Sequence, residues 1–270
     1  MKKRFFFFIL ALNIAFVTAY GQEYRGKFSS SASIAARSNY NNMLYPYTFR
    51  GPDYGLNFEW QTLGAKQWLS DVKIMLHYAP LYASNSAINV KLFNSFVYTL
   101  GAEIQVQQMK KIKALSSENF SFFAGGNLSG AVSYQVFSDM AEATYSFNPL
   151  DFSLGGSLYA EYKWGKATLS NNFQLLLLAG VFYPHYGNNN PFTSVGTAGN
   201  YFLFSTVGKL NRFSNLLKVE FPITIKKKLW NTFFVGYRLA FERSTLRDNP
   251  YRDITHSLCL GIVFRISKYN

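Results

Sequence analysis

Apolar and polar residues alternate along most of this sequence, and the alternating segments are long. Between residues 96 and 107 the apolar set is Phe96, Tyr98, Leu100, Ala102, Ile104 and Val106. Successive side chains of a β-strand point to opposite faces, so such a segment has one apolar and one polar face. Strands of soluble sandwiches have about 5–6 residues, whereas a strand that crosses a bilayer needs roughly 9–11. The pattern therefore predicts a transmembrane β-barrel, with lipid outside and a polar lumen inside.

The same pattern recurs often enough to predict the size of the barrel. We expect an all-β fold: an antiparallel transmembrane β-barrel of about ten strands. Eight or twelve strands stay open, because glycines and Asn148-Pro149 between residues 119 and 164 allow further breaks. The expected strands are 24–36, 53–63, 69–80, 88–107, 119–137, 142–164, 167–181, 213–226, 229–244 and 254–266.

The N-terminus has the layout of a secretory signal peptide. Lys2, Lys3 and Arg4 precede an apolar stretch at 5–17, and small residues of Ala19-Tyr20-Gly21 precede Gln22. The stretch is short for a membrane-spanning helix, so we expect a cleaved signal peptide rather than a retained anchor. The expected domains are therefore a signal peptide at 1–21 and one outer-membrane β-barrel domain at 22–270.

The charge of the chain bears on its partners. Without the three basic residues of the signal, 24 basic and 14 acidic residues remain, a net charge of +10. Export argues against nucleic acid as the partner of this basic surface. Outer-membrane lipid, including lipopolysaccharide, suits it better, although basic charge also serves solubility alone. Cys259 is the single cysteine, so no disulfide can form within the chain.

The turns suggest an orientation. Gly165-Lys166 and the segment 226–228 leave room for little more than a hairpin, whereas 37–52, 183–200 and 244–253 are longer and rich in Asn, Pro, Tyr and Gly. Outer-membrane barrels have short periplasmic turns and long outer loops. Both termini are then periplasmic and the strand number is even. For this reason we assign 182–212 to one long outer loop, with room for a short helix or a partial strand.

Aromatic and charged residues fit the two faces of this barrel. Tyr and Trp residues near the strand ends predict interfacial girdles: Tyr24, Trp60, Trp68, Tyr78, Trp164, Tyr183 and Trp230. Charged residues and one histidine occupy the phase that we expect to face the lumen. These are Glu59, Asp71, Lys73, His77, Glu103, Glu161, Lys163, Lys218, Glu220, Arg238, Glu242 and Arg265. In a narrow lumen such charges are expected to pair and plug the passage, which disfavours a porin.

Three segments resemble a known family. They are Tyr54-Gly55, the run Gly180-Val181-Phe182-Tyr183-Pro184-His185-Tyr186-Gly187, and the closing 257–265. Here the chain resembles small outer-membrane β-barrel proteins of Gram-negative gut anaerobes, a family of unknown function. The resemblance implies the architecture and the bacterial outer membrane as the location. It implies no activity and no catalytic residue.

Candidate chemistry is sparse. The sequence has three histidines, and His256 and Ser257 are adjacent in a strand, so they point to opposite faces and cannot form a dyad. An outer-membrane lipid-modifying enzyme or protease stays an alternative, since Asp248, Asp253 and His185 belong to outer segments that could meet across loops. Phosphate-loop, zinc and EF-hand motifs are missing, so we expect neither a cofactor nor a metal.

The leading hypothesis is a non-enzymatic outer-membrane barrel for surface binding or envelope structure, carried by the long loops 182–212 and 37–52. A small-solute, porin-like channel is the second alternative. Besides outer-membrane lipid or lipopolysaccharide, we expect contact with the barrel-assembly machinery and, through the loops, with a surface glycan or protein. The candidate loop recognition residues are Tyr183, His185, Tyr186, Asn188 and Asn189.

Overall fold

The computed structural model describes most of the chain after residue 24. The described residues are 25–41, 45–64, 66–84, 96–138, 144–147, 150–183, 201–225, 228–245 and 251–267. The expected signal peptide at 1–21 lies outside them. Within the described residues no helix is long and apolar enough to cross a membrane.

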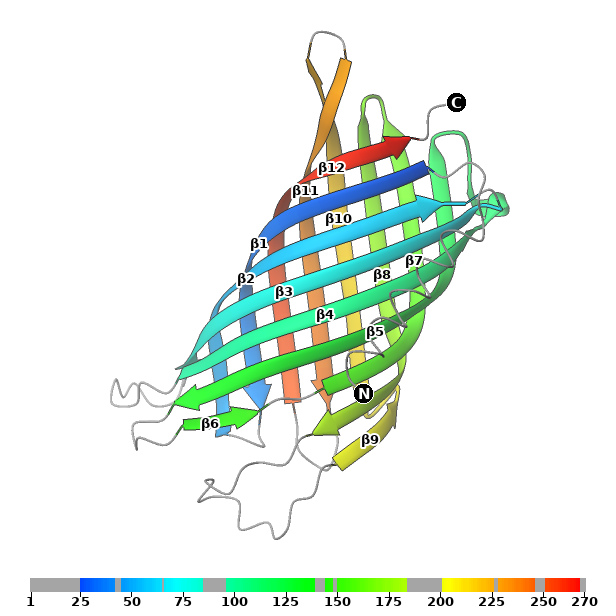
Figure 1. Ribbon diagram of the computed structural model, residues 1–270. Coiled ribbons are helices and arrows are strands. Elements are labelled where there is room, and N and C mark those ends of the chain that lie inside the picture. Colours follow the sequence, from blue (N-terminus) through cyan, green and yellow to red (C-terminus); the bar gives the residue numbers. More distant parts are fainter. Residues whose placement is uncertain are drawn as a thin grey trace, which may run out of the picture.

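Ten long antiparallel strands form a closed barrel (Figure 1). Each strand pairs with its neighbours in the chain, and the barrel closes where β1 pairs with β12 and where β8 pairs with β10. The strands are β1 (Arg25–Asn41), β2 (Tyr45–Leu63), β3 (Trp68–Ser84), β4 (Phe96–Lys111), β5 (Phe120–Ser138), β7 (Leu150–Trp164), β8 (Ala167–Tyr183), β10 (Leu210–Ile225), β11 (Lys228–Ser244) and β12 (Tyr251–Ser267). The predicted strand number, ten, is confirmed.

Two short strands extend the wall at one end. β6 (Thr144–Phe147) pairs with the end of β5, and β9 (Tyr201–Thr206) pairs with the end of β8. Both lie at the end of the barrel opposite the short turns, which we call the loop end (Figure 1). β6 and β7 flank 148–149, where the sequence contains Asn148-Pro149. β9 is the partial strand for which the expected loop 182–212 left room.

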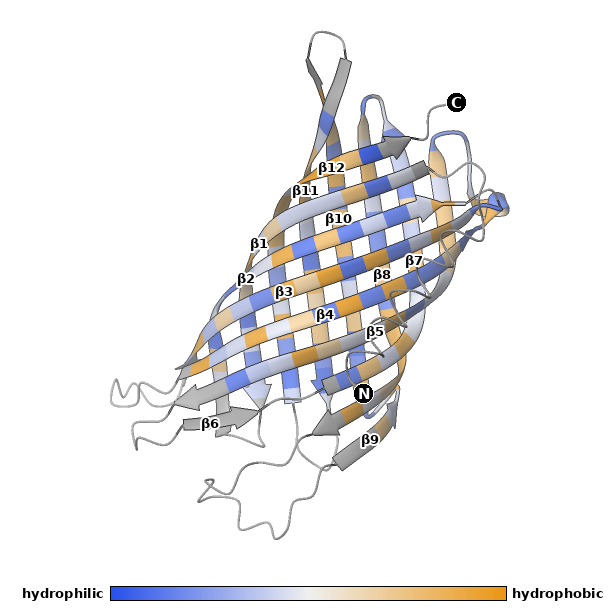
Figure 2. Cartoon of the chain, in the orientation of Figure 1, coloured by the Kyte–Doolittle hydropathy of each residue, from blue (hydrophilic) through white to orange (hydrophobic). Residues whose placement is uncertain are grey.

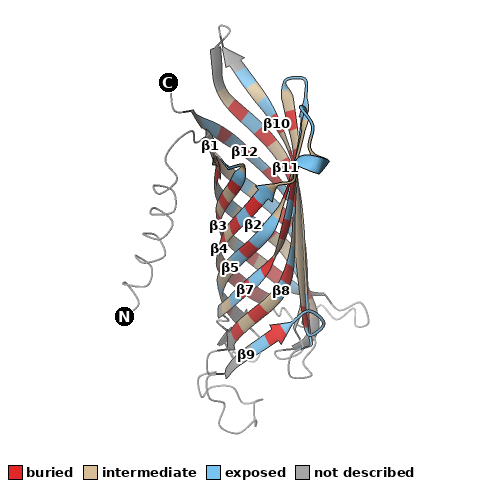
Figure 3. Cartoon of the chain, turned by 90° about the vertical axis from the view of Figure 1, so that its right-hand side faces the viewer, coloured by how far each residue is buried: buried red, intermediate tan, exposed pale blue. Residues whose placement is uncertain are grey.

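The two faces of the wall differ as the alternation predicts. Bands of opposite hydropathy follow one another along each strand, and buried and exposed residues alternate in the same way (Figures 2 and 3). Outward-facing apolar side chains stay exposed on the closed barrel, for example Leu56, Leu100, Leu128 and Leu260 at 46–60%. A continuous apolar outer wall is stable in lipid and unfavourable in water.

Aromatic residues bound this apolar wall. Trp60, Trp68 and Trp164 are exposed on its outside near the short turns, and Tyr78 is exposed towards the loop end. The other girdle residues that the sequence suggested, Tyr24, Tyr183 and Trp230, have side chains outside the described part. The strands have 15–19 residues, more than the roughly 9–11 that cross the hydrocarbon layer, so their ends extend beyond it.

Some expected boundaries are wrong. Residues 37–41 belong to β1 and 45–52 to β2, so the segment 37–52 is not a long loop. The Asn, Pro and Gly residues there suggested a loop. In the structure the two halves of the segment pair with each other as parts of β1 and β2, with Arg37 opposite Gly51. The expected loop 182–212 is also too long, because β8 includes residues 182–183 and β10 includes residues 210–212. Residues 88–95, which we assigned to a strand, lie outside the described part.

We expect Leu260→Arg to lower the stability of the barrel in lipid by about 2–4 kcal/mol, because the arginine would lie on the lipid face near the bilayer midplane. Leu260 lies halfway between His256 and Phe264 on the outside of β12. The control is Ala36→Arg, level with His256 near the interface, where the cost is about 0–1 kcal/mol. The measurement is denaturant unfolding of protein refolded into vesicles. Equal losses in the two variants would contradict a lipid-facing outer wall.

Candidate functional site

The lumen near the short turns is crossed by a network of paired charges, which we call the ionic plug. Its members are Lys27, Glu59, Asp71, Lys73, Glu161, Lys218, Glu220 and Arg265. Glu59 lies at its centre, 3.2 Å from the Nζ of Lys73 and 3.1 Å from the Nζ of Lys218. Glu220 is 1% exposed and lies 3.4–3.6 Å from three cations, Lys27, Lys218 and Arg265.

Several contacts of the plug cross the lumen rather than follow the wall. Lys218 on β10 reaches Glu59 on β2, and three strands, β11, β12 and β1, lie between them around the barrel. Lys27 on β1 reaches Glu161 on β7, on the far side of the barrel, at 3.1 Å. Amide side chains add a further crossing, because Asn172 on β8 donates to Gln107 on β4 at 3.2 Å. These contacts between opposite walls fill the cross-section of the lumen.

The plug is electrically balanced. It contains four cations and four carboxylates, so its net charge is zero. Pairing of this kind is what allows charges to be buried, since an unpaired buried charge is costly. A cavity of only ≈ 50 Å³ lies among Glu59, Lys73 and Lys218, room for about one or two water molecules.

Above the plug, the lumen widens into a cup of ≈ 270 Å³ towards the loop end. Its wall carries Arg37, Arg212 and Arg238, together with His77 and a set of carboxylates. The carboxylates are Asp53, Glu103, Asp151, Glu242 and Asp253. Among the residues that the structure describes, no group of His, Cys, Asp and Glu is arranged to hold a metal ion.

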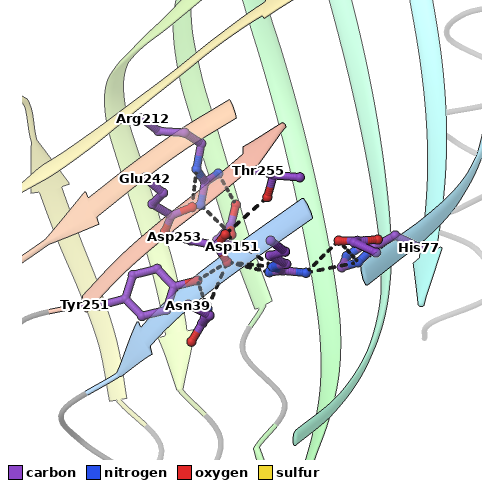
Figure 4. Close-up of polar contacts among 10 residues, drawn as sticks. Asn39, His77, Asp151, Arg212, Glu242, Tyr251, Asp253 and Thr255 are labelled. Carbon is purple, nitrogen blue, oxygen red and sulfur yellow. Dashed lines mark hydrogen bonds and ion pairs between the residues drawn. The ribbon is translucent and has the colours of Figure 1, made fainter. Parts of the chain in front are cut away.

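Arg37 is held between two carboxylates on one side of the cup. Its Nη2 donates to Asp253 at 2.6 Å and its Nη1 donates to Asp53 at 3.1 Å. Asp253 also accepts from Asn39 at 2.8 Å and from the Tyr251 hydroxyl at 3.1 Å (Figure 4). The side chain of Arg37 is 11% exposed, so the arginine and its partners form a rigid part of the wall.

Arg212 repeats this arrangement on the neighbouring strands. Its two terminal nitrogens donate to both oxygens of Asp151 at 3.0 Å, and its Nε donates to Glu242 at 2.8 Å (Figure 4). This bidentate geometry is the one that a guanidinium forms best with a carboxylate. Each arginine is therefore bound by two carboxylates, and each three-residue group has a net charge of −1.

The two groups meet at an unfavourable pair. Glu242 on β11 lies directly opposite Asp253 on β12, and both face the lumen. Like charges directly opposite one another on neighbouring strands repel. Around the wall the order is Asp53, Arg37, Asp253, Glu242, Arg212, Asp151. The cup as a whole has five carboxylates and three arginines, a net charge of −2 with His77 neutral.

Arg238 lies at the boundary between the cup and the plug, and it lines the cavities of both. Its Nη1 is 2.7 Å from the sulfur of Met75, and its Nη2 is 3.9 Å from Glu103. Glu103 also accepts from Gln105 at 2.6 Å. This pairing is looser than that of Arg37 and Arg212.

His77 lies beside Arg37 and Asp53 in the cup. Its Nδ1 is 3.2 Å from Arg37 Nη1 and 3.5 Å from Asp53 Oδ2. Gly101 makes room for the ring, because a Cβ at position 101 would overlap the imidazole. In a hydrolytic His–carboxylate couple the carboxylate accepts the Nδ1 proton. Here the guanidinium of Arg37 contacts both partners and competes for that geometry.

The structure places the sequence-suggested residues in three groups. Glu59, Asp71, Lys73, Glu161, Lys218, Glu220 and Arg265 form the plug, and His77, Glu103, Arg238 and Glu242 line the cup. Lys163 faces solvent near the end of β7. Tyr183 ends β8, and the other loop candidates, His185, Tyr186, Asn188 and Asn189, lie outside the described residues, as does Asp248.

The sequence reasoning missed the two arginine groups. Arg37 and Arg212 were not singled out because 37–52 and 182–212 were assigned to loops. Asp53 and Asp151 lay in expected strands but were not included among the lumen charges. One pattern could have found Arg37 and Asn39: both continue the inward phase of Ser33 and Ala35.

The fold is similar to that of a solved outer-membrane barrel. The OmpT outer membrane protease of Escherichia coli superposes with a TM-score of 0.55 at 7% identity, over 91% of this chain and 99% of that one. The translocator domain of the autotransporter NalP of Neisseria meningitidis gives 0.49 at 6% identity, over 95% and 94%. Ail of Yersinia pestis gives 0.37 at 13%, over 88% and 99%.

Sequence comparison does not assign a family. No protein-family model matches the chain. A segment of 149 residues is 24% identical to enolase-phosphatase E1 of Drosophila virilis, which is 54% of this chain and 55% of the length of that protein. We conclude that the chain is an outer-membrane β-barrel. The conclusion rests on its closed ten-stranded barrel, its apolar outer wall and its similarity to the OmpT barrel.

We expect Lys218→Met to destabilise the barrel by about 3–5 kcal/mol, because it leaves Glu59 and Glu220 buried without this cation. Lys218 is 4% exposed and its ammonium also lies over the Phe234 ring. Lys163→Met is the matched control, since Lys163 is exposed, and its effect should stay within about 0.5 kcal/mol. Denaturant unfolding in vesicles measures both. A Lys218→Met loss as small as the control's would show that the plug does not stabilise the fold.

Proposed function

We propose that this chain is a non-enzymatic, non-conducting outer-membrane barrel that binds a small polar ligand in the cup at its loop end. The observation that carries the proposal is the ionic plug beneath the cup, whose contacts cross the lumen from β10 to β2 and from β1 to β7. A passage filled by paired charges opposes the flow of solutes. A cup that has the plug at its base and lies at the loop end favours binding at the cell surface.

The charge of the cup suggests the class of ligand. Its net charge of −2 and the facing carboxylates Glu242 and Asp253 favour a ligand that carries positive charge, such as an amine or a guanidine. An ammonium group between these two carboxylates would relieve their repulsion. Arg37 and Arg212 already neutralise part of the negative charge of the wall. The remaining negative charge is therefore concentrated near Glu242 and Asp253 rather than spread around the cup.

The outer loops and the other partners extend this proposal. The segment 184–200, which contains His185, Tyr186, Asn188 and Asn189, connects β8 and β9 at the loop end. Contacts of these loops with a surface glycan or protein, and contacts of the barrel with lipopolysaccharide and the assembly machinery, stay predictions. Membership of the family of outer-membrane β-barrel proteins of Gram-negative gut anaerobes also stays a prediction.

A hydrolytic function has less support. OmpT is described as a protease, and this chain shares its fold at 7% identity. The pair formed by His77 and Asp53 is the feature that resembles a catalytic couple. Since Arg37 donates to Asp53 and also contacts His77 Nδ1, the carboxylate is less able to orient and activate the imidazole.

We expect the unmodified protein to give no conductance steps in planar bilayers. A variant that removes both crossings, Lys27→Ser, Glu59→Ser, Glu161→Ser and Lys218→Ser, should conduct, because it takes away two cations and two carboxylates together. Arg212→Ser with Glu242→Ser changes the cup, keeps the plug and should stay silent. Slower migration after boiling in gel electrophoresis checks that each variant is folded. Steps from the unmodified protein would favour the channel alternative.

We expect the cup to bind a short diamine such as putrescine at least tenfold more tightly than succinate, a dicarboxylate of similar length, in calorimetric titration. Glu242→Gln with Asp253→Asn should weaken diamine binding by about tenfold, which corresponds to about 1.4 kcal/mol. Glu118→Gln is the control, because Glu118 is an exposed carboxylate outside the cup. Equal affinity for the two compounds would reject a cation-selective cup.

A further inference from the structure

Three arginines form a row on the outside of the barrel at the loop end. Arg50 on β2, Arg243 on β11 and Arg252 on β12 all occupy the outward phase of their strands and are exposed. Their inward neighbours confirm the phase, since Phe49, Glu242 and Asp253 face the lumen side. β1 lies between β2 and β12, so the row spans four adjacent strands.

The spacing of the row follows from the register. Arg243 lies directly opposite Arg252, and Arg252 lies opposite Tyr40 of β1. Arg50 lies opposite Ser38, two residues before Tyr40 in β1. Directly opposed residues of an antiparallel pair have their Cα atoms about 4.5–5.5 Å apart. The guanidinium groups of Arg243 and Arg252 can therefore contact one ligand, which the long side chain of Arg50 can approach from two strands away.

The positive charges of these arginines repel one another. Arg243 and Arg252 are like charges on directly opposed positions, which disfavours the pair of strands. Among the described residues, none of the three arginines forms an ion pair with a carboxylate, whereas Arg37 and Arg212 inside the barrel each bind two. An anion with several oxygens would offset the repulsion, and a guanidinium binds phosphate through two parallel hydrogen bonds.

The level of the row on the barrel indicates where that anion comes from. Just below it, the Tyr237 hydroxyl and His256 Nδ1 lie 2.6 Å apart on the outer surface, as in an interfacial girdle. Further down β12, Leu258, Leu260 and Ile262 are exposed and apolar. Acyl chains would lie against these residues, and the phosphate of the same lipid would reach the arginines.

We propose that Arg50, Arg243 and Arg252 bind the phosphate group of an acylated lipid headgroup in the outer leaflet. This site is on the outer wall and does not depend on the cup or on the plug. The arginines fix the phosphate, and the apolar wall below them receives the acyl chains. Binding joins β11, β12 and β2 through one anion and offsets the Arg243–Arg252 repulsion.

The test measures lipid retention by native mass spectrometry of the purified full chain in detergent. The probes are diphosphoryl lipid A, the same lipid after enzymatic dephosphorylation, and inorganic phosphate. The variant is Arg50→Gln, Arg243→Gln and Arg252→Gln together. The charge-matched control is Lys110→Gln, Lys113→Gln and Lys166→Gln, which removes three exposed cations at the other end of the barrel.

We expect the arginine variant to retain diphosphoryl lipid A at least tenfold less than the unmodified protein, and the lysine variant less than twofold less. Dephosphorylated lipid should bind both variants and the unmodified protein equally weakly. If both variants lost lipid retention equally, overall charge would explain the loss, and the proposed arginine site would be rejected. Inorganic phosphate that competes at the concentration of the lipid would show a free-phosphate site and overturn the headgroup assignment.

A second measurement separates lipid binding from folding. Arg252→Gln alone removes the like-charge pair, so it should leave the thermal unfolding temperature unchanged or raise it in detergent without phosphorylated lipid. In detergent with diphosphoryl lipid A the same substitution should lower that temperature relative to the unmodified protein. A decrease of the same size in both conditions would make Arg252 a structural residue and overturn the proposal.

Discussion

The structure depends on the hydrogen bonding of the backbone in lipid. A strand in the hydrocarbon layer has no water to satisfy its N–H and C=O groups, so both of its edges must pair with other strands. The pairings β1–β12 and β8–β10 meet this requirement by closing the sheet. Closure at ten strands also sets the width of the lumen, and a barrel of this size brings side chains from opposite walls within reach of one another.

That width explains why the lumen is divided into two levels. Lys27 and Lys218 are long enough to reach carboxylates across the lumen, and in the plug every cation has a carboxylate within 4 Å. In the cup, the contacts of Arg37 with Asp53 and of Arg212 with Asp151 follow the wall, and Arg238 on β11 crosses to Met75 on β3 and Glu103 on β4 at its base. A cavity of ≈ 270 Å³ therefore remains in the cup, whereas the plug leaves only ≈ 50 Å³.

The sequence predicts the fold better than the site. The alternation around Leu260 and Leu100 depends only on neighbouring residues, and so does the tight turn at Gly165-Lys166, where Gly165 has a φ of 58°. The pairing of Lys27 with Glu161 depends on the curvature of ten strands, which no local pattern contains. The register of β1 against β12, which brings Arg37 to Asp253, is set by pairing between the two ends of the chain.

Residue phase decides what an arginine does in this barrel. Asp253 and Arg252 are consecutive, yet Asp253 faces the lumen and binds Arg37, whereas Arg252 faces outward beside Arg243. Inside, low solvent access makes an unpaired charge costly, so the strands supply carboxylates. Outside, the described wall supplies none to the arginines, and the surroundings must provide the counter-charge. A positive outer wall at the loop end and a negative cup therefore coexist within a single layer of strands, because alternate residues of each strand face different media.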